Sequence, residues 1–80
     1  MITGRQLKAA RILLGWTQPE LVNKSGVKLQ TVQRMESKGP AHSTHDNAQK
    51  VIDTLKAAGA IFIDDGDAST FGGSGVRLKS

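Results

Sequence analysis

Long polar side chains gather in one short stretch of the chain. Gln30, Gln33 and Arg34 carry most of the hydrogen-bonding groups, and Lys28 and Leu29 come directly before them. A glutamine amide can pair with adenine through two hydrogen bonds, an arginine can do so with guanine, and a leucine can contact the thymine methyl group. We therefore expect these five residues to contact base edges of DNA, which is recognition chemistry rather than catalysis.

A second set of residues suits the DNA backbone. Phosphate oxygens accept hydrogen bonds from lysines, from hydroxyl and amide side chains, and from helix N-termini, and these contacts add affinity without reading sequence. The residues that we expect at phosphates are Thr17, Gln18, Lys24, Thr31 and Lys38. The alternative is that both sets form an ordinary solvated helix face.

The positive charge is concentrated in one part of the chain. The net charge is +4. Residues 1–58 contain nine Lys/Arg and four Asp/Glu, a balance of +5, whereas residues 59–80 contain two Lys/Arg and three Asp, a balance of −1. A surface that faces phosphates has this distribution, and so do ordinary solvated lysines.

Residue types that other functions need are scarce. The chain has no cysteine and only two histidines, His42 and His45, so we expect no metal site. The acidic residues within 64–67 lack the later bidentate glutamate of a calcium loop. We expect no cofactor and no enzymatic activity. No apolar run approaches the roughly 20 residues that span a bilayer, so we expect a cytoplasmic protein without a membrane partner.

Capping residues and apolar spacing place the first three helices. Thr3 with Gln6, and Thr17 with Glu20, form capping-box patterns at the starts of the first and second helices. Gly26 suits a turn with positive φ after the second helix. The third helix is expected from about residue 28 to residue 37. It would therefore follow the second after one tight turn.

Arg11 is the unusual member of the first helix. It lies on the same stripe as Leu7, Ala10 and Leu14, which recur at helical spacing and should face the core. A charge among apolar residues needs a partner. The sequence therefore predicts that Arg11 is buried in an ion pair, although it could also be an ordinary surface charge.

The spacing of apolar residues changes from a helical to a strand pattern after a predicted fourth helix. Ser43 with Asp46 predicts the start of that helix, which should reach about Ala58. Residues 60–64 and 76–79 have strand patterns, and residues 65–75 are rich in Gly, Ser and Asp. A two-stranded hairpin is marginal by itself, so it must pack on the helices or pair with a second subunit. We divide the chain into a helical DNA-binding domain, residues 1–58, and a hairpin, residues 59–80.

These residues together resemble a known family. With Arg11 and Gly15, the chain resembles the phage Cro/repressor-type helix-turn-helix family, also called the xenobiotic-response-element family, in the pattern Thr17-Gln18-x-Glu20-Leu21-Val22-x-x-Ser25-Gly26-Val27-x-x-x-Thr31-Val32-x-Arg34-Met35-Glu36. The C-terminal part is similar to a group of short bacterial regulators of this family, in Ala57-Ala58-Gly59, Phe62-Ile63, Gly72-Gly73 and Gly75-Val76-Arg77-Leu78.

The resemblance implies a fold and roles for particular residues. The fold would be mainly α, a lambda-repressor-like bundle of four to five short helices, followed here by an antiparallel β-hairpin. Gln18 would contact phosphate, and the residues from Lys28 to Arg34 named above would face bases. Arg11 and Glu36 would form a buried ion pair that ties the first helix to the third. Lys28 stands where the family often has Ser or Thr, so the third helix should lack a side-chain cap.

The expected function is sequence-specific binding of double-stranded DNA by a transcriptional regulator. We expect a repressor that acts as a homodimer on a two-fold operator, with half-sites about 34 Å apart. Two alternatives remain. One is the DNA-binding antitoxin of a toxin–antitoxin pair, whose hairpin binds the toxin protein. The other is a helix-turn-helix adaptor that binds the transcription machinery without reading sequence.

Overall fold

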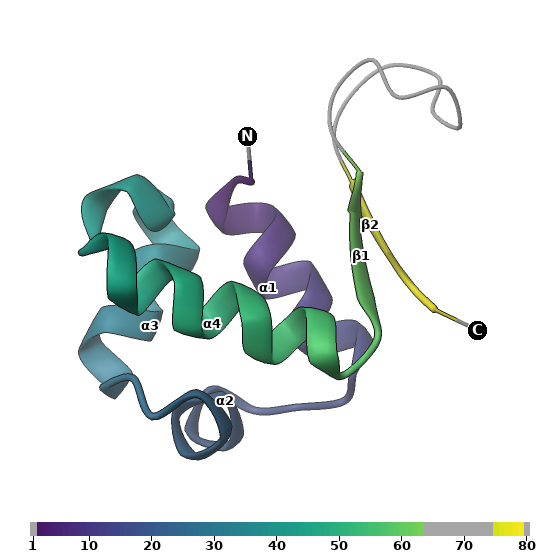
Figure 1. The fold of residues 1–80 in the computed structure, drawn as a ribbon, viewed down its shortest axis with the longest axis horizontal. Helices are drawn as coiled ribbons and strands as arrows, with labels where there is room; N and C mark the ends of the chain where they lie inside the picture. Colours follow the sequence, from purple (N-terminus) through teal and green to yellow (C-terminus); the bar gives the residue numbers. More distant parts are fainter. Residues whose placement is uncertain (1, 64–74, 80) are drawn as a thin grey trace.

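The computed structural model describes residues 2–63 and 75–79 as a small helical bundle with a two-stranded sheet at one end (Figure 1). The described elements are α1 (Gly4–Leu13), α2 (Gln18–Ser25), α3 (Leu29–Lys38), the 3₁₀ helix η1 (Pro40–His42), α4 (His45–Ala57), β1 (Ala60–Ile63) and β2 (Gly75–Leu78). This order confirms the mainly α fold class with a C-terminal antiparallel hairpin. Of the expected loop over residues 65–75, residues 65–74 lie outside the described residues, as does the acidic stretch 64–67, whereas Gly75 begins β2.

Two of the predicted capping boxes are present. The Thr3 hydroxyl accepts from the Gln6 backbone N–H at 3.2 Å, and the Gln6 side chain accepts from the Thr3 N–H at 2.7 Å. Thr17 and Glu20 form the same pair of bonds at the start of α2. Each box satisfies N–H groups that the first helical turn leaves free.

The prediction that Ser43 caps α4 is wrong. The cap is Thr44, whose hydroxyl accepts from the Asn47 N–H at 3.2 Å. Pro40 begins a 3₁₀ turn that carries the chain past the expected start, and the Ser43 N–H bonds back to the Pro40 carbonyl at 3.1 Å. Ser43 therefore ends this turn, and its hydroxyl is buried without a hydrogen-bond partner among the described residues.

Apolar residues from all four α-helices meet in one core. Each helix turns its predicted apolar stripe toward this core, although Leu14, Val22, Ala48 and Ile52 are only half-buried against it, and Ala60 of β1 joins the core. The buried apolar residues are Leu7, Ala10, Leu21, Val27, Val32, Met35, Val51, Leu55 and Ala60. The spacing of apolar residues predicts which positions face the core because each of these helices turns only one stripe inward.

Gly4 allows α1 to approach the end of α3 closely. A Cβ atom at this position would lie 2.5 Å from the Met35 carbonyl oxygen and 2.6 Å from the Glu36 carbonyl oxygen. Backbone oxygens cannot move aside as a flexible side chain can. Gly4 is therefore required by the packing of α1 on α3, which fixes how these two helices sit together.

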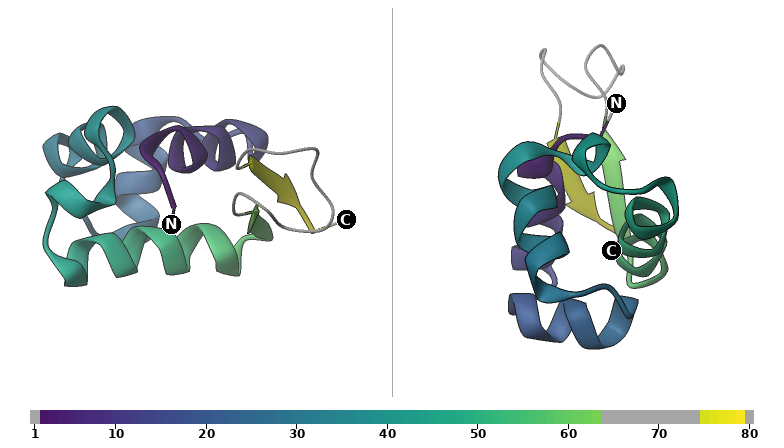
Figure 2. Two further views of the ribbon diagram at one scale, coloured as in Figure 1. Left: turned by 90° about the horizontal axis from the view of Figure 1, so that it is seen from above. Right: turned by 90° about the vertical axis from the view of Figure 1, so that its left-hand side faces the viewer.

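The hairpin covers one end of the helical layers, with β2 beside α1 and β1 beside α4 (Figure 2). The strands are antiparallel, with Ala60 opposite Leu78 and Ile63 opposite Gly75. Gln6 holds the hairpin to α1, because its amide nitrogen donates to the Ile63 carbonyl at 3.0 Å and to the Gly75 carbonyl at 2.8 Å. In the described part of the chain, no helix has the length and apolarity needed to cross a membrane.

Candidate nucleic-acid interface

α2 and α3 are joined by a tight turn that begins at a glycine. Gly26 follows α2 with a left-handed backbone, φ 75° and ψ 12°, which glycine adopts without a steric penalty. Its N–H donates to the Val22 carbonyl at 2.8 Å. Val27, directly after the turn, is buried in the core. The turn therefore holds the start of α3 close to the end of α2.

α3 separates a buried face from an exposed one. Val32, Met35 and Glu36 are buried. The exposed residues at its start and along its outer side are the five expected to contact bases: Lys28, Leu29, Gln30, Gln33 and Arg34. Within the described part of the chain, Arg34 makes one hydrogen bond outside the helix ladder, in which its carbonyl accepts from the Ser37 hydroxyl at 3.3 Å. The structure therefore leaves these polar side chains available to a ligand.

The start of α3 lacks a side-chain cap, as expected from Lys28. The Lys28 backbone is extended and its carbonyl accepts from the Val32 N–H at 3.0 Å, but its side chain caps no N–H group. Among the described residues, no side chain caps the first amides of α3. A helix N-terminus with free N–H groups favours a negatively charged neighbour.

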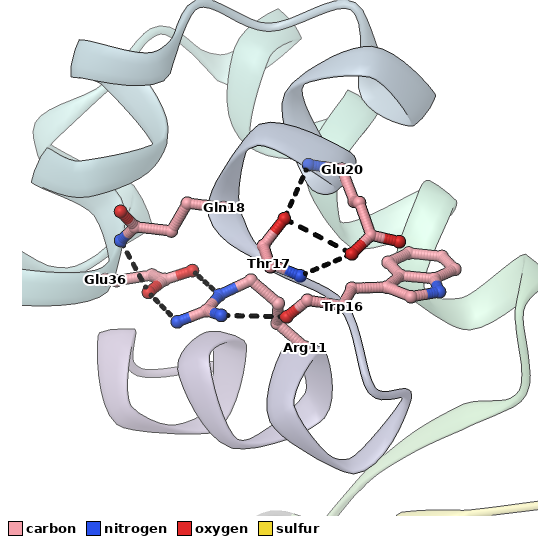
Figure 3. A network of polar contacts seen from close by, with 6 residues as sticks. All are labelled: Arg11, Trp16, Thr17, Gln18, Glu20 and Glu36. Atoms are coloured by element: carbon pink, nitrogen blue, oxygen red, sulfur yellow. Dashed lines mark hydrogen bonds and ion pairs between the residues drawn. The ribbon is translucent and has the colours of Figure 1, made fainter.

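The predicted ion pair between Arg11 and Glu36 is present (Figure 3). The Arg11 Nε atom lies 2.8 Å from Glu36 Oε2, and the second nitrogen, Nη2, lies 3.1 Å from Oε1. The two side chains are 11% and 5% exposed. This two-pronged geometry matches the fork of a guanidinium to the plane of a carboxylate and fixes the relative orientation of α1 and α3.

Two further contacts complete this network. Arg11 Nη1 donates to the Trp16 carbonyl at 2.9 Å, which ties it to the chain entering α2. The Gln18 amide nitrogen donates to Glu36 Oε1 at 3.1 Å (Figure 3). Gln18 is expected at a phosphate from the sequence, and no local pattern indicates this bond to Glu36. Because Glu36 accepts from both α1 and α2, one buried carboxylate holds α3 to both preceding helices.

The other residues expected at phosphates lie at separate places. The Thr17 hydroxyl belongs to the α2 cap and also bonds Glu20 Oε1 at 3.2 Å. Lys38 is exposed in the last turn of α3. Lys24 lies with its ammonium 5.0 Å from the centre of the Trp16 ring, a cation–π contact that sequence analysis missed. This contact holds the Lys24 ammonium group over the Trp16 ring.

A polar pocket beside α3 was not predicted from the sequence. Thr31 and Arg34 line it from α3, and Thr44 and Asn47 line it from the start of α4, around a volume of about 460 Å³. Ala41 and His42 of η1 and Ser43 complete the lining between these two segments. No local pattern in the sequence indicates that they meet, because their proximity depends on how η1 turns the chain.

Comparison with known proteins adds no family assignment. No protein-family model and no curated protein matches the chain.

Proposed function

We propose that this chain is a sequence-specific DNA-binding regulator with a lambda-repressor-like helix-turn-helix fold. α3 would lie in the major groove, and α2 would cross the phosphate backbone beside it. The observation that carries the proposal is the contrast between the two faces of α3. On its outer face the side chains of Gln30, Gln33 and Arg34 make no hydrogen bond to any other described residue, while its inner face is anchored through Glu36.

Rigid support is what a base-reading helix requires. Discrimination between bases depends on placing bidentate donors and acceptors within a few tenths of an ångström of the base edge. Three hydrogen bonds converge on Glu36, two from Arg11 and one from Gln18. A buried ion pair is costly to desolvate, but it gives a specific geometry, and this one fixes how α3 lies against α1 and α2. The anchoring therefore favours recognition over passive exposure.

The remaining basic residues would supply affinity. Lys24 and the start of α2 belong to the helix before α3, and Thr31 and Lys38 belong to α3 itself; all of them would contact phosphates beside the groove. We further propose a homodimer that represses transcription by occupying a two-fold operator. Two copies of α3 would then enter successive major grooves about 34 Å apart.

The first experiment identifies the operator by selecting bound duplexes from random DNA. Affinities of purified variants are then measured on the selected site and on single-position variants of it. Gln30→Ala and Arg34→Ala should each cost roughly 1–3 kcal/mol on the best site and lose discrimination at one base position. Lys38→Ala should weaken all sequences alike and reduce the salt dependence of binding.

A matched control removes the same charge far from α3. Lys56 is exposed in the last turn of α4, next to the hairpin, so Lys56→Ala should leave operator affinity within about twofold at equal salt. If selection enriches no sequence, the chain does not read DNA, and an adaptor function would replace this proposal. If Gln30→Ala and Arg34→Ala lower the affinity equally for every sequence, the assigned roles are wrong.

A further inference from the structure

One edge of β2 presents backbone groups that have no strand partner among the residues that the structure describes. Continuing the strand register places Lys79 opposite Gly59, and the Lys79 N–H donates to the Gly59 carbonyl at 2.6 Å. In an antiparallel pair, residues facing the partner strand alternate with residues facing away from it. The backbone groups of Arg77 therefore face β1, and those of Val76 and Leu78 face the opposite edge. That edge has no strand neighbour among the described residues.

A groove with an apolar floor borders this edge. Ile12 and Leu13 at the end of α1 form this floor and line the groove together with Gly75 and Val76 of β2. Polar residues of α1 and of the end of α3, among them Arg5 and Lys38, line the rest of its volume of about 860 Å³. Ile12 is 56% exposed and Leu13 is 48% exposed, the two most exposed large apolar residues in the described part of the chain. A strand added to the edge of β2 would lie beside this floor.

The chain itself contains a strand that fits. Val76 and Leu78 share the face of the sheet that is turned toward the helices, together with Ala60 and Phe62. Leu78 is half-buried and lies outside the core cluster, so it is available to a partner. Each copy therefore offers an apolar floor and also the strand β2, whose apolar residues could cover the floor of the other copy. Such mutual complementarity is the property of a two-fold interface.

We propose that two copies pair through the free edges of β2 and form one four-stranded sheet. The two-fold axis would pass at Arg77, which puts Val76 of each copy opposite Leu78 of the other. Both residues direct their N–H and C=O groups to this edge, so this register forms four backbone hydrogen bonds. The sheet would also exceed the two strands that are marginal alone. This interface rests on the proposed function for its two-fold requirement, but it is tested without DNA.

Arg77 gives the interface a like-charge contact that can be tested. The two Arg77 side chains would face each other on the exposed face of the sheet, and like charges directly opposite weaken strand pairing. An equal mixture of the wild type and Arg77→Glu should therefore form the mixed dimer in preference to either homodimer. Tagged copies and native mass spectrometry measure the proportions, and a statistical mixture would contradict the register.

Cysteine cross-linking tests the same axis directly, because the chain contains no cysteine. At a pair that does not exchange hydrogen bonds, the Cα atoms lie about 4.5 Å apart, within the range that a disulfide spans. Arg77→Cys should give a covalent dimer on mild oxidation. Lys56→Cys, exposed at the end of α4, is the matched control and should remain monomeric on a denaturing gel.

Sedimentation equilibrium without DNA completes the test. Leu13→Gln should weaken dimerisation at least tenfold, and Leu29→Gln, an exposed leucine on α3 outside this groove, should not. A wild-type chain that stays monomeric at high concentration overturns the interface, even if operator binding is observed. Equal cross-linking at positions 56 and 77, or an unchanged dimer in Leu13→Gln, overturns it as well. Failure to select an operator while cross-linking at position 77 persists would refute the DNA-binding function alone.

Discussion

Replacing Glu36 by glutamine removes the charge on which the α1–α2–α3 junction depends. The substitution keeps the size and shape of the side chain. It replaces one carboxylate oxygen by an NH₂ group, which must then face donors from Arg11 or Gln18. A donor facing a donor cannot form a hydrogen bond, so at least one of the present contacts is lost. Arg11 also remains as a mostly buried charge without a counter-charge.

The size of the effect follows from burial. Glu36 and Arg11 are 5% and 11% exposed, so water screens the lost attraction poorly. Removing one partner of a buried pair typically costs about 3–5 kcal/mol. Glutamine retains one acceptor oxygen, which favours the lower end, about 3 kcal/mol. For a chain of 80 residues, this corresponds to a fall in melting temperature of roughly 12–24 °C.

Thermal and urea unfolding followed by circular dichroism provide the measurement. Glu20→Gln is the control, because Glu20 is exposed and glutamine also serves at this position of a capping box, so stability should change by less than about 0.5 kcal/mol. The double variant Arg11→Met with Glu36→Met should recover at least half of the loss, since it leaves no charge buried. A Glu36→Gln variant that melts within about 2 °C of the wild type would refute the reasoning, because then the pair does not hold α3.

Four further substitutions test packing and capping. Gly4→Ala should destabilise the chain by about 1–3 kcal/mol in urea unfolding, because the added methyl group would overlap backbone oxygens at the end of α3; an unchanged midpoint would show that α1 can shift freely. Gln6→Leu should lose about 1–3 kcal/mol and speed amide exchange in the hairpin more than in α4, since two strand carbonyls lose their donor; uniform acceleration would argue against a local tether. Thr44→Ala should cost about 1 kcal/mol as a lost cap, whereas Ser43→Ala should be neutral or stabilising, and the reverse order would restore the original assignment of Ser43.

Local patterns predicted the helices because their determinants lie within one or two turns. The boxes of Thr3 with Gln6 and of Thr17 with Glu20 each join residues three positions apart, and such pairs form wherever a helix starts. Gly26 is predictable for a similar reason, since the left-handed backbone after α2 disfavours other residues. Even so, Ser43 and Thr44 are adjacent hydroxyl residues, and either side chain can cap a helix. Only the 3₁₀ turn before them decides between the two.

The sequence predicts which residues form the candidate recognition surface, but it predicts only part of the contacts that hold α3 in place. Amphipathic spacing separated the buried Val32 and Met35 from the outer residues of α3. The Arg11–Glu36 pair was predicted from a charge on an apolar stripe and from the family resemblance. The bond from Gln18 to Glu36 was not, because a glutamine at the start of a helix has several possible partners and no local signal selects one.

The sequence by itself determined where the helices begin, which stripe each one buries and which polar residues α3 leaves outside. These properties depend on neighbours within a few positions along the chain. The tertiary structure decided the contacts that join distant segments: Gln18 to Glu36, Lys24 over Trp16, and Gln6 to both strands of the hairpin. Long side chains such as these reach many possible partners, and only the packing of the helices and the hairpin selects which one lies within hydrogen-bonding distance.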